Sequence, residues 1–257
     1  MKLKIYAVLT CIIFLFSNCN DVLDRPSLTS AEDAAYWTSE SRVRLYANAF
    51  YSNFFVGYGV GYETTYAPNA NYTFNDDAVI RSTQRNFNRS VPTSKGSTSL
   101  DIKWESEFTG PTWNFAWVRK ANIMLARIDS EMTNILTEEQ YNHWTGIGRF
   151  FRALEYARLV NVFGDVPYYD TEVQDALYKD RTPRNEVMDA VYDDFDFAMQ
   201  NVRKSDGAQN VDRYVVAAFV SRWALFEASW QKYYYKDNER AKKFFEQAIT
   251  SAAIVMG

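Results

Sequence analysis

The sequence has few of the residues that build metal centres and nucleophilic active sites. It contains one His and two Cys among 257 residues. A protein-built zinc centre needs several Cys or His ligands, and a Ser-His-Asp triad needs a His beside its nucleophile. The composition therefore argues against both kinds of site. We expect no metal, no cofactor and no catalytic residues in this chain.

The sequence also lacks an excess of positive charge. It has 28 Lys and Arg residues against 32 Asp and Glu residues, for a net charge of -4. A protein that binds nucleic acid through a basic surface carries the opposite balance, so we expect no nucleic-acid partner. The hydrophobic fraction of 47% and the charged fraction of 23% are typical of a folded domain and not of a disordered chain.

Long apolar runs are absent except near the N-terminus. Lys2 and Lys4 precede a stretch from Ile5 to Phe16 that only Thr10 interrupts. This stretch is too short to span a bilayer as a helix and is typical of the apolar core of a signal peptide. We therefore predict a signal peptide over residues 1–18, and no later segment resembles a transmembrane helix.

A cysteine, Cys19, directly follows this leader. Its position resembles that of the acylated cysteine in a bacterial lipobox, which predicts a mature chain that begins at Cys19 and is held to a membrane by acyl chains. The alternative is a cleaved secretory signal followed by an incidental cysteine. Residues 19–257 are expected to form the folded region in either case.

Beyond residue 38 the apolar residues recur at helical spacing. The sequence predicts helices over 39–54, from about Pro111, over 137–163, and from near 182, 212 and 237. Expected buried stripes include Val43, Phe50 and Phe54 in the first helix; Trp113, Trp117, Ala121, Met124, Leu125 and Ile128 in the second; Val187, Val191, Phe195, Ala198 and Val202 in the fourth; Ala217, Ala218, Ala224, Leu225 and Ala228 in the fifth; Ala241, Phe244, Phe245, Ala248 and Ala252 in the sixth.

Local signals mark the ends of several of these helices. Thr137 and Gln140 form a capping box, Gly164 and Pro167 end the same helix, and Asp212 can cap the fifth helix. Asp237 or Asn238 can cap the sixth. The last two helices resemble an antiparallel hairpin of the tetratricopeptide kind. The predicted fold class is all-α, with tetratricopeptide-like hairpins and long irregular loops.

The chain ends with the sixth helix, at Met256 and Gly257, and no capping repeat follows. A helical stack that ends there leaves an apolar face open. We therefore expect that the chain is truncated or that a partner covers this face.

An irregular segment interrupts the helical pattern between residues 57 and 110. It is rich in Gly, Pro, Asn and Ser, yet it carries eight aromatic residues, namely four Tyr, three Phe and one Trp. Sugar rings stack on flat aromatic side chains, and their hydroxyls bind short polar ones. The glycan-binding candidates are Tyr58, Tyr66, Tyr72, Phe74 and Trp104, with Asn71, Asp76, Asp77 and Arg81 as polar partners. The alternative is that these rings pack the loops onto the helices.

Several blocks of sequence, taken in order, resemble the SusD/RagB-like outer-membrane lipoproteins of Bacteroidota. The most specific block is Arg149–Val160 followed by Phe163-Gly164-Asp165-Val166-Pro167. The other blocks are Cys19–Pro26, Tyr36–Glu40, Ala47–Tyr51 and the group Trp113, Trp117, Ala121 and Asn122. Members of this family are typically about twice as long, so the chain resembles their N-terminal half.

This resemblance implies a cell-surface lipoprotein on the outer membrane that captures an oligo- or polysaccharide. It also implies a partner, a SusC-like TonB-dependent transporter, which receives the glycan. A tetratricopeptide-like scaffold for protein interactions is the alternative, and a secreted glycoside hydrolase is a third. Two further groups receive structural interpretations: Asp193, Asp194 and Asp196 as a solvated acidic face, and His143 as a surface or core residue.

Overall fold

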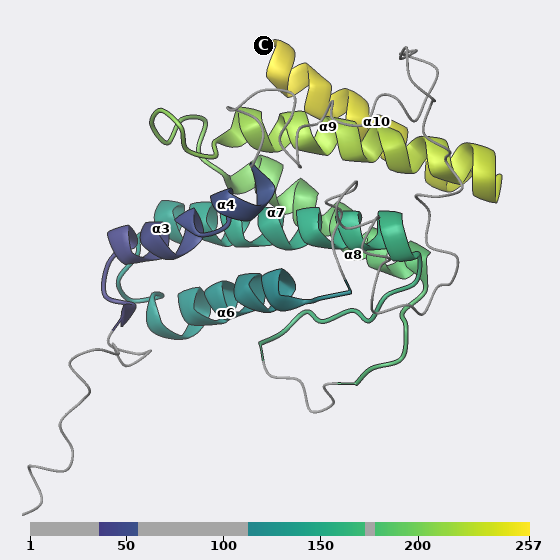
Figure 1. Cartoon of the computed structure of the whole chain (residues 1–257). Coiled ribbons are helices and arrows are strands. Elements are labelled where there is room, and N and C mark those ends of the chain that lie inside the picture. The colour runs from purple at the N-terminus through teal and green to yellow at the C-terminus, as the bar shows by residue number, and fades with distance from the viewer. Residues whose placement is uncertain (1–35, 56–112, 173–177) are drawn as a thin grey trace, which may run out of the picture. The chain divides into compact units, whose positions relative to one another are not determined.

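Helices form the regular structure of the described part of the chain. The computed structural model describes residues 36–55, 113–172 and 178–257. Within these ranges, β pairing is limited to one bridge between Val166 and Thr182. The helices are α3 (Glu40–Asn48), α4 (Tyr51–Phe54), α6 (Ala116–Glu131), α7 (Glu138–Phe163), α8 (Arg184–Asn201), α9 (Arg213–Trp230), the π-helical turn η3 (Gln231–Tyr235) and α10 (Asn238–Met256) (Figure 1). The predicted all-α class is confirmed.

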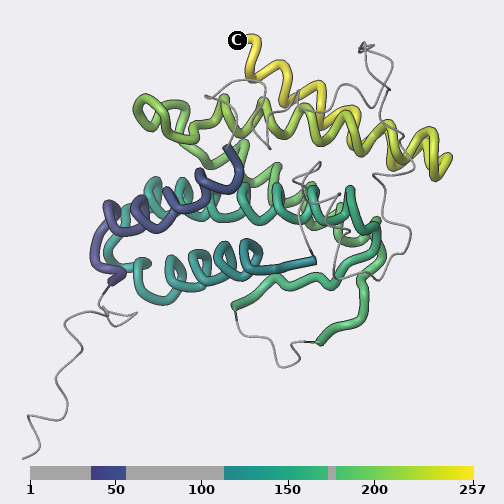
Figure 2. Tube along the Cα trace, in the orientation of Figure 1, coloured from purple at the N-terminus to yellow at the C-terminus, as the bar shows by residue number. Residues whose placement is uncertain are grey.

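Successive long helices pack against each other in chain order and run in alternating directions. α6 packs on α7, α7 on α8, α8 on α9 and α9 on α10 (Figure 2). α3 packs on both α6 and α7. The hairpin predicted for the last two helices is therefore present as α9 and α10. Small residues on the facing sides of these two helices, Ala217, Ala224, Ala228 and Ala241, are buried.

The central helix α7 has neighbours on three sides, and this explains its composition. A helix that is buried nearly all round needs apolar residues on every face. Phe150, Phe151, Leu154 and Leu159 are all at most 2% exposed. The start of α7 is the predicted capping box: the Thr137 hydroxyl accepts from the backbone N–H of Gln140 at 3.3 Å, and the backbone N–H of Thr137 donates to the Gln140 side chain at 2.9 Å. Gly164 ends the helix with a φ of +72°.

The helix predicted over 39–54 is divided in two. The backbone N–H groups of Ala49 and Phe50 bond three residues back, to Tyr46 and Ala47, so the chain tightens between α3 and α4. This tighter turn places Phe50 against Phe151 of α7, with ring centroids 4.6 Å apart and ring planes 10° apart. The break between α3 and α4 thus coincides with a stacked pair of aromatic rings in the core, Phe50 and Phe151.

The second helix begins later than predicted, at Ala116 rather than near Pro111. The side-chain oxygen of Asn114 accepts from the backbone N–H of Ala116 at 2.7 Å, and this local bond fixes the start of α6. Trp113 therefore lies before the helix, where it packs edge to face on Phe163 at 5.1 Å. Ala121, Met124 and Ile128 are buried as expected, whereas Trp113, Trp117 and Leu125 are only partly buried.

The fifth helix has the predicted cap but a narrower buried face. Asp212 accepts from the N–H groups of Tyr214 and Val215, both at 2.9 Å, and Asp237 in turn caps α10. Ala218 and Leu225 were expected inside, but they are exposed, Leu225 by 53%. The buried positions of α9 recur from Ala217 at spacings of three and four. Ala218 and Leu225 each follow one of these buried positions by one residue. Successive residues of an α-helix are rotated by about 100° around its axis, so both side chains lie off the buried face.

Buried ion pairs connect three of the helices, and one of them corrects the predicted acidic face. Asp193 is exposed and Asp196 partly so, but Asp194 is only 4% exposed. Arg152 of α7 holds Asp194 of α8 through two hydrogen bonds, of 2.7 and 2.8 Å. Arg184 of α8 holds Glu227 of α9 in the same bidentate way. A charge in the interior needs such a partner, because an unpaired one is strongly unfavourable.

None of the helices within the described ranges has the length and apolar character needed to cross a lipid bilayer.

Two glycines of α7 give a test of how tightly this helix is packed. A Cβ at Gly146 would lie 2.8 Å from a methyl carbon of buried Val202 and 3.6 Å from the backbone of α8. A Cβ at Gly148 would lie 2.8 Å from Cδ2 and 3.1 Å from Cγ of Leu125, a partly exposed side chain that can turn away, and 3.9 Å from the sulfur of Met124. Overpacking costs about 1–3 kcal/mol, and Ala favours a helix by about 1 kcal/mol over Gly.

We therefore predict that Gly146→Ala lowers the free energy of unfolding by about 1 kcal/mol, whereas Gly148→Ala leaves it unchanged or raises it. Urea unfolding of both variants beside the wild type would measure this difference. Equal effects of the two substitutions would contradict the tight contact between α7 and Val202.

Candidate functional site

A cavity of about 340 Å³ opens where α6 begins. One side is formed by the start of α6 and the other by the extended segment that follows α7. The lining residues are Asn114, Phe115, Ala116, Val118, Arg119, Asn122, Tyr169, Thr171 and Glu172. A volume of this size lies at the lower end of the range found for small-ligand sites.

Three side chains from the helices hold the extended wall of the cavity. The Asn122 amide donates to the backbone carbonyls of Tyr169 and Thr171, at 2.9 and 3.1 Å. Arg152 donates to the carbonyl of Asp170 at 3.0 Å and to the Asn122 side-chain oxygen at 3.1 Å. The Tyr156 hydroxyl donates to the carbonyl of Tyr169 and accepts from its N–H, at 3.1 and 2.6 Å. The position of this wall is therefore fixed through its backbone.

The clamping groups are themselves buried. Asn122 is 2% exposed and Tyr156 is 1% exposed. Burial raises the pKa of Tyr156 far above its ordinary value, so its hydroxyl remains protonated at any physiological pH. Asn122 uses its amide nitrogen and its oxygen within the protein. These residues position the wall and do not offer free groups to a ligand.

Two aromatic rings in contact with each other line the cavity, one at the start of α6 and one on the extended segment. Phe115 and Tyr169 lie edge to face with ring centroids 5.5 Å apart, and both are partly exposed. The ammonium group of Lys179 lies 5.5 Å from the centre of the Tyr169 ring and donates to the carbonyl of Tyr168 at 3.2 Å. Part-exposed rings beside polar groups are the combination that suits a sugar ring.

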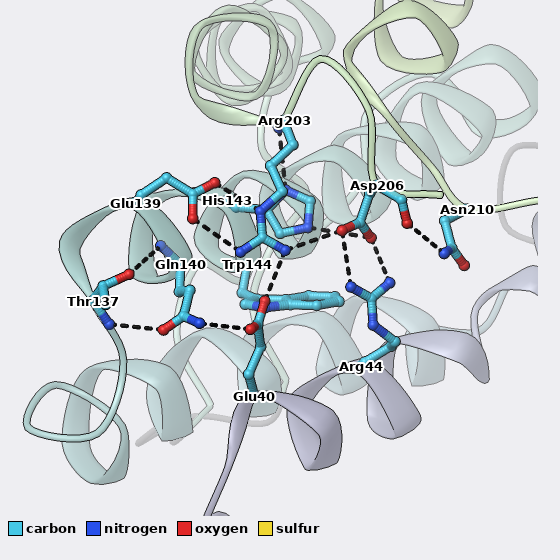
Figure 3. A network of polar contacts seen from close by, with 10 residues as sticks. All are labelled: Glu40, Arg44, Thr137, Glu139, Gln140, His143, Trp144, Arg203, Asp206 and Asn210. Atoms are coloured by element: carbon cyan, nitrogen blue, oxygen red, sulfur yellow. Dashed lines mark hydrogen bonds and ion pairs between the residues drawn. The ribbon is translucent and has the colours of Figure 1, made fainter. Parts of the chain in front are cut away.

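A second polar cluster surrounds His143, but it is enclosed. Arg203 donates to Glu139 and to Asp206, and also contacts Glu40 (Figure 3). Asp206 is bound at its other side by Arg44. These contacts connect α3, the start of α7 and the segment between α8 and α9. His143 itself is 0% exposed, so a substrate cannot reach its ring.

The His143 ring is held in its neutral form. Its Nδ1 accepts from the backbone N–H of Arg203 at 3.2 Å, which places the ring proton on Nε2, 3.7 Å from Asp206. Burial lowers the pKa of His143 to about 4, and the positive charge of Arg203 acts in the same direction. We expected His143 to be a surface or core residue, and it is a core residue. Its cluster joins helices and carries no chemistry.

An exposed aromatic row on α9 and η3 was not anticipated from the sequence. Phe226, Trp230 and Tyr234 follow each other at intervals of four, with stacked neighbours 6.2 and 4.6 Å apart. Phe226 is 40% and Tyr234 68% exposed. Because Trp230 stacks against both of its neighbours, part of the ring surface in this row is already occupied within the protein. This geometry suits an apolar contact better than a sugar platform.

Within the described ranges, no group of three or more His, Cys, Asp or Glu side chains could hold a metal ion.

The chain matches the model of a SusD-like family over residues 43–225. The family is described as "Starch-binding associating with outer membrane". The chain belongs to the SusD-like family. The match covers well over half of the chain and includes α6, α7 and the wall of the cavity.

Curated and solved SusD-like proteins agree with this assignment. The chain is 22% identical to SusD-like protein P25 of Formosa agariphila over 244 residues, which are 90% of this chain and 44% of that protein. A SusD-like protein of Bacteroides fragilis is similar in structure, with a TM-score of 0.56, 22% identity, and coverage of 88% of this chain and 39% of the other. A SusD homolog of Bacteroides thetaiotaomicron has a TM-score of 0.57 at 15% identity and covers 87% and 41%.

These structural likenesses establish the fold. The SusD-like chain spans less than half of the length of these relatives.

The block that carried the resemblance now has a structural explanation. Arg152 and Tyr156 of the SusD-like hallmark clamp the wall of the cavity, and Asn122, from another of the matching blocks, completes the clamp. Phe115 and Tyr169 were not singled out from the sequence. They are far apart in the chain, and no periodic pattern connects them.

The glycan-binding candidates predicted from the sequence lie outside the described residues. These are Tyr58, Tyr66, Tyr72, Phe74, Trp104, Asn71, Asp76, Asp77 and Arg81, and the proposed lipidation site Cys19 lies outside them as well.

The lowered pKa of His143 predicts a pH-dependent stability. An unfolded chain protonates this residue below about pH 6.5, whereas the folded chain does so only near pH 4. The unfolded state therefore binds more protons in this interval, and the folded state loses stability as the pH falls through it. The contribution is fully present above about pH 6.5.

We predict that His143→Asn, which keeps an acceptor near the Nδ1 position, removes this dependence. The free energy of unfolding of the wild type, relative to the variant, should fall by up to about 3 kcal/mol between pH 6.5 and pH 4. Urea unfolding of both proteins at several pH values measures the difference, in which contributions of other groups cancel. Parallel curves for the two proteins would show that the ring is not held neutral.

Proposed function

We propose that this SusD-like chain is part of a glycan-binding lipoprotein on the cell surface. It would be anchored to the outer membrane through Cys19 and would deliver an oligo- or polysaccharide to a SusC-like TonB-dependent transporter. The family description supports both starch or glycan binding and an association with the outer membrane. The observation that carries the proposal within this chain is the cavity that Phe115 and Tyr169 line.

The cavity suits capture of a sugar unit and not cleavage of a glycosidic bond. Phe115 and Tyr169 supply ring surface, and each stacking contact contributes about 1 kcal/mol. Glycoside hydrolysis ordinarily needs a pair of carboxyl groups on either side of the bond. Among the described lining residues Glu172 is the one carboxylate, and Arg127 already binds it through two hydrogen bonds. The site therefore favours a binding protein.

Weak contacts of this kind become effective when a ligand repeats. A polysaccharide presents many similar units, so several modest sites on one surface raise the overall affinity without further contacts. The predicted loop candidates, including Tyr66, Tyr72 and Trp104, would supply additional sites of this type.

A protein-interaction scaffold is the second candidate function. The row of Phe226, Trp230 and Tyr234 on α9 and η3 favours it, because exposed apolar groups on a helical surface are common at protein interfaces. The two functions are compatible if this row contacts a protein while the cavity binds a glycan.

We predict that Phe115→Ala weakens glycan binding about threefold to tenfold, as expected for the loss of one stacking contact. A glycan array with the full chain, including maltoheptaose, would first identify a ligand, and calorimetric titration would then compare the variants. Phe226→Ala, which removes an exposed ring outside the cavity, serves as the matched control.

A triple variant, Tyr66→Ala with Tyr72→Ala and Trp104→Ala, tests the loop candidates in the same titration. Undiminished affinity of Phe115→Ala would exclude the cavity as the binding site. Undiminished affinity of both variants would exclude the two proposed locations together.

A further inference from the structure

The charged side chains at the cavity leave one positive charge without an acidic partner among the described residues. Among the described residues that line it, Arg119 and Glu172 are the charged ones. Glu172 is neutralised by Arg127, whose two terminal nitrogens bind its two carboxylate oxygens in bidentate geometry. Arg119 is exposed, and among the described residues no carboxylate pairs with it. A guanidinium with free donors therefore remains at the edge of the cavity.

Asn114 offers a further donor at this end of the cavity. The Asn114 oxygen is occupied by the backbone N–H of Ala116, so the amide nitrogen of Asn114 is the part available to a ligand. The carbonyls of Tyr169 and Thr171 already accept from Asn122. Arg119 and Asn114 thus offer donors beside the two rings, and a ligand that matches these two side chains carries acceptors.

A guanidinium binds a carboxylate particularly well, because its planar fork places two N–H groups opposite two oxygens. The ammonium group of Lys179 lies 5.5 Å from the centre of the Tyr169 ring and adds a positive charge beside the other wall, although Lys179 is not among the lining residues. Asp170 is in the same segment, but it is not among the lining residues.

We propose that this cavity accepts an acidic sugar, with the carboxylate of a uronic acid unit on Arg119 and the apolar face of its ring against Phe115 and Tyr169. This inference rests on the proposed function and specifies its class of ligand. A neutral sugar would use the same rings but would leave the guanidinium without a partner.

A trisaccharide of galacturonic acid and its methyl ester provide the sharpest pair of probes. The two ligands share every ring and hydroxyl, and they differ at the carboxyl groups, which are charged in the acid and carry a neutral methyl ester in the other ligand. Titration of the full chain with both should give about tenfold tighter binding of the free acid at low salt, which corresponds to about 1.4 kcal/mol. This preference should shrink as the salt concentration rises, because the site is partly exposed.

Arg119→Gln should abolish the preference and bind acid and ester alike. Arg119→Lys, which keeps the charge but loses the fork, should retain an intermediate preference. Arg222→Gln removes an exposed arginine of α9 and serves as the control, with the preference of the wild type. Circular dichroism of each variant verifies that the helices are intact.

Equal binding of acid and ester by the wild type would overturn this inference, as would a preference that survives in Arg119→Gln. Binding of a neutral glycan alone would overturn it as well, but would leave the proposed function in place. If no oligosaccharide on a broad array binds, the proposed function itself fails.

Discussion

The buried ion pair between Arg152 and Asp194 is the interaction on which the arrangement around the cavity depends. Its guanidinium binds α8 through Asp194, α6 through Asn122, and the extended wall through the carbonyl of Asp170. Both charges are buried, so each needs the other. Loss of either partner would leave an uncompensated charge and would also release the wall. Fold and site therefore share one set of hydrogen bonds.

The same kind of contact recurs along the stack and gives it a defined register. Apolar stripes bring α7, α8 and α9 together, but hydrophobic contact is not directional and tolerates sliding. Arg184 with Glu227 fixes α8 against α9 at one turn, and Gln231 of η3 donates to the same carboxylate at 2.7 Å. Arg240 of α10 reaches Asp189 of α8 at 3.0 Å. Such pairs select one arrangement among several that bury similar area.

What could be predicted from the sequence was local. Thr137, Asp212 and Asp237 act on groups within three residues of themselves, and their caps were correctly anticipated. The later start of α6 depends on the hydrogen bond from the backbone N–H of Ala116 to the Asn114 side chain. The helical spacing of Trp113 and Trp117 instead predicted that the helix already includes Trp113. Asp194 was assigned to a solvated face because its partner is 42 residues away, beyond any local pattern. For the same reason the pair of Phe115 and Tyr169 could not be recognised, although the resemblance placed Arg152, Tyr156 and Asn122 in matching blocks.

The clamp on the cavity wall binds only backbone atoms of the wall. The position of the wall therefore does not depend on which side chains the wall carries. Asn122, Arg152 and Tyr156 bind carbonyl and N–H groups of residues 169–171, which every residue type supplies, apart from the N–H that proline lacks. The side chains at these positions can therefore change without moving the chain that carries them. A helical frame of this kind would allow one lineage to exchange ligand-facing residues while it keeps the same folded framework, and it offers an engineer the lining positions 169 and 171 for redesigning selectivity.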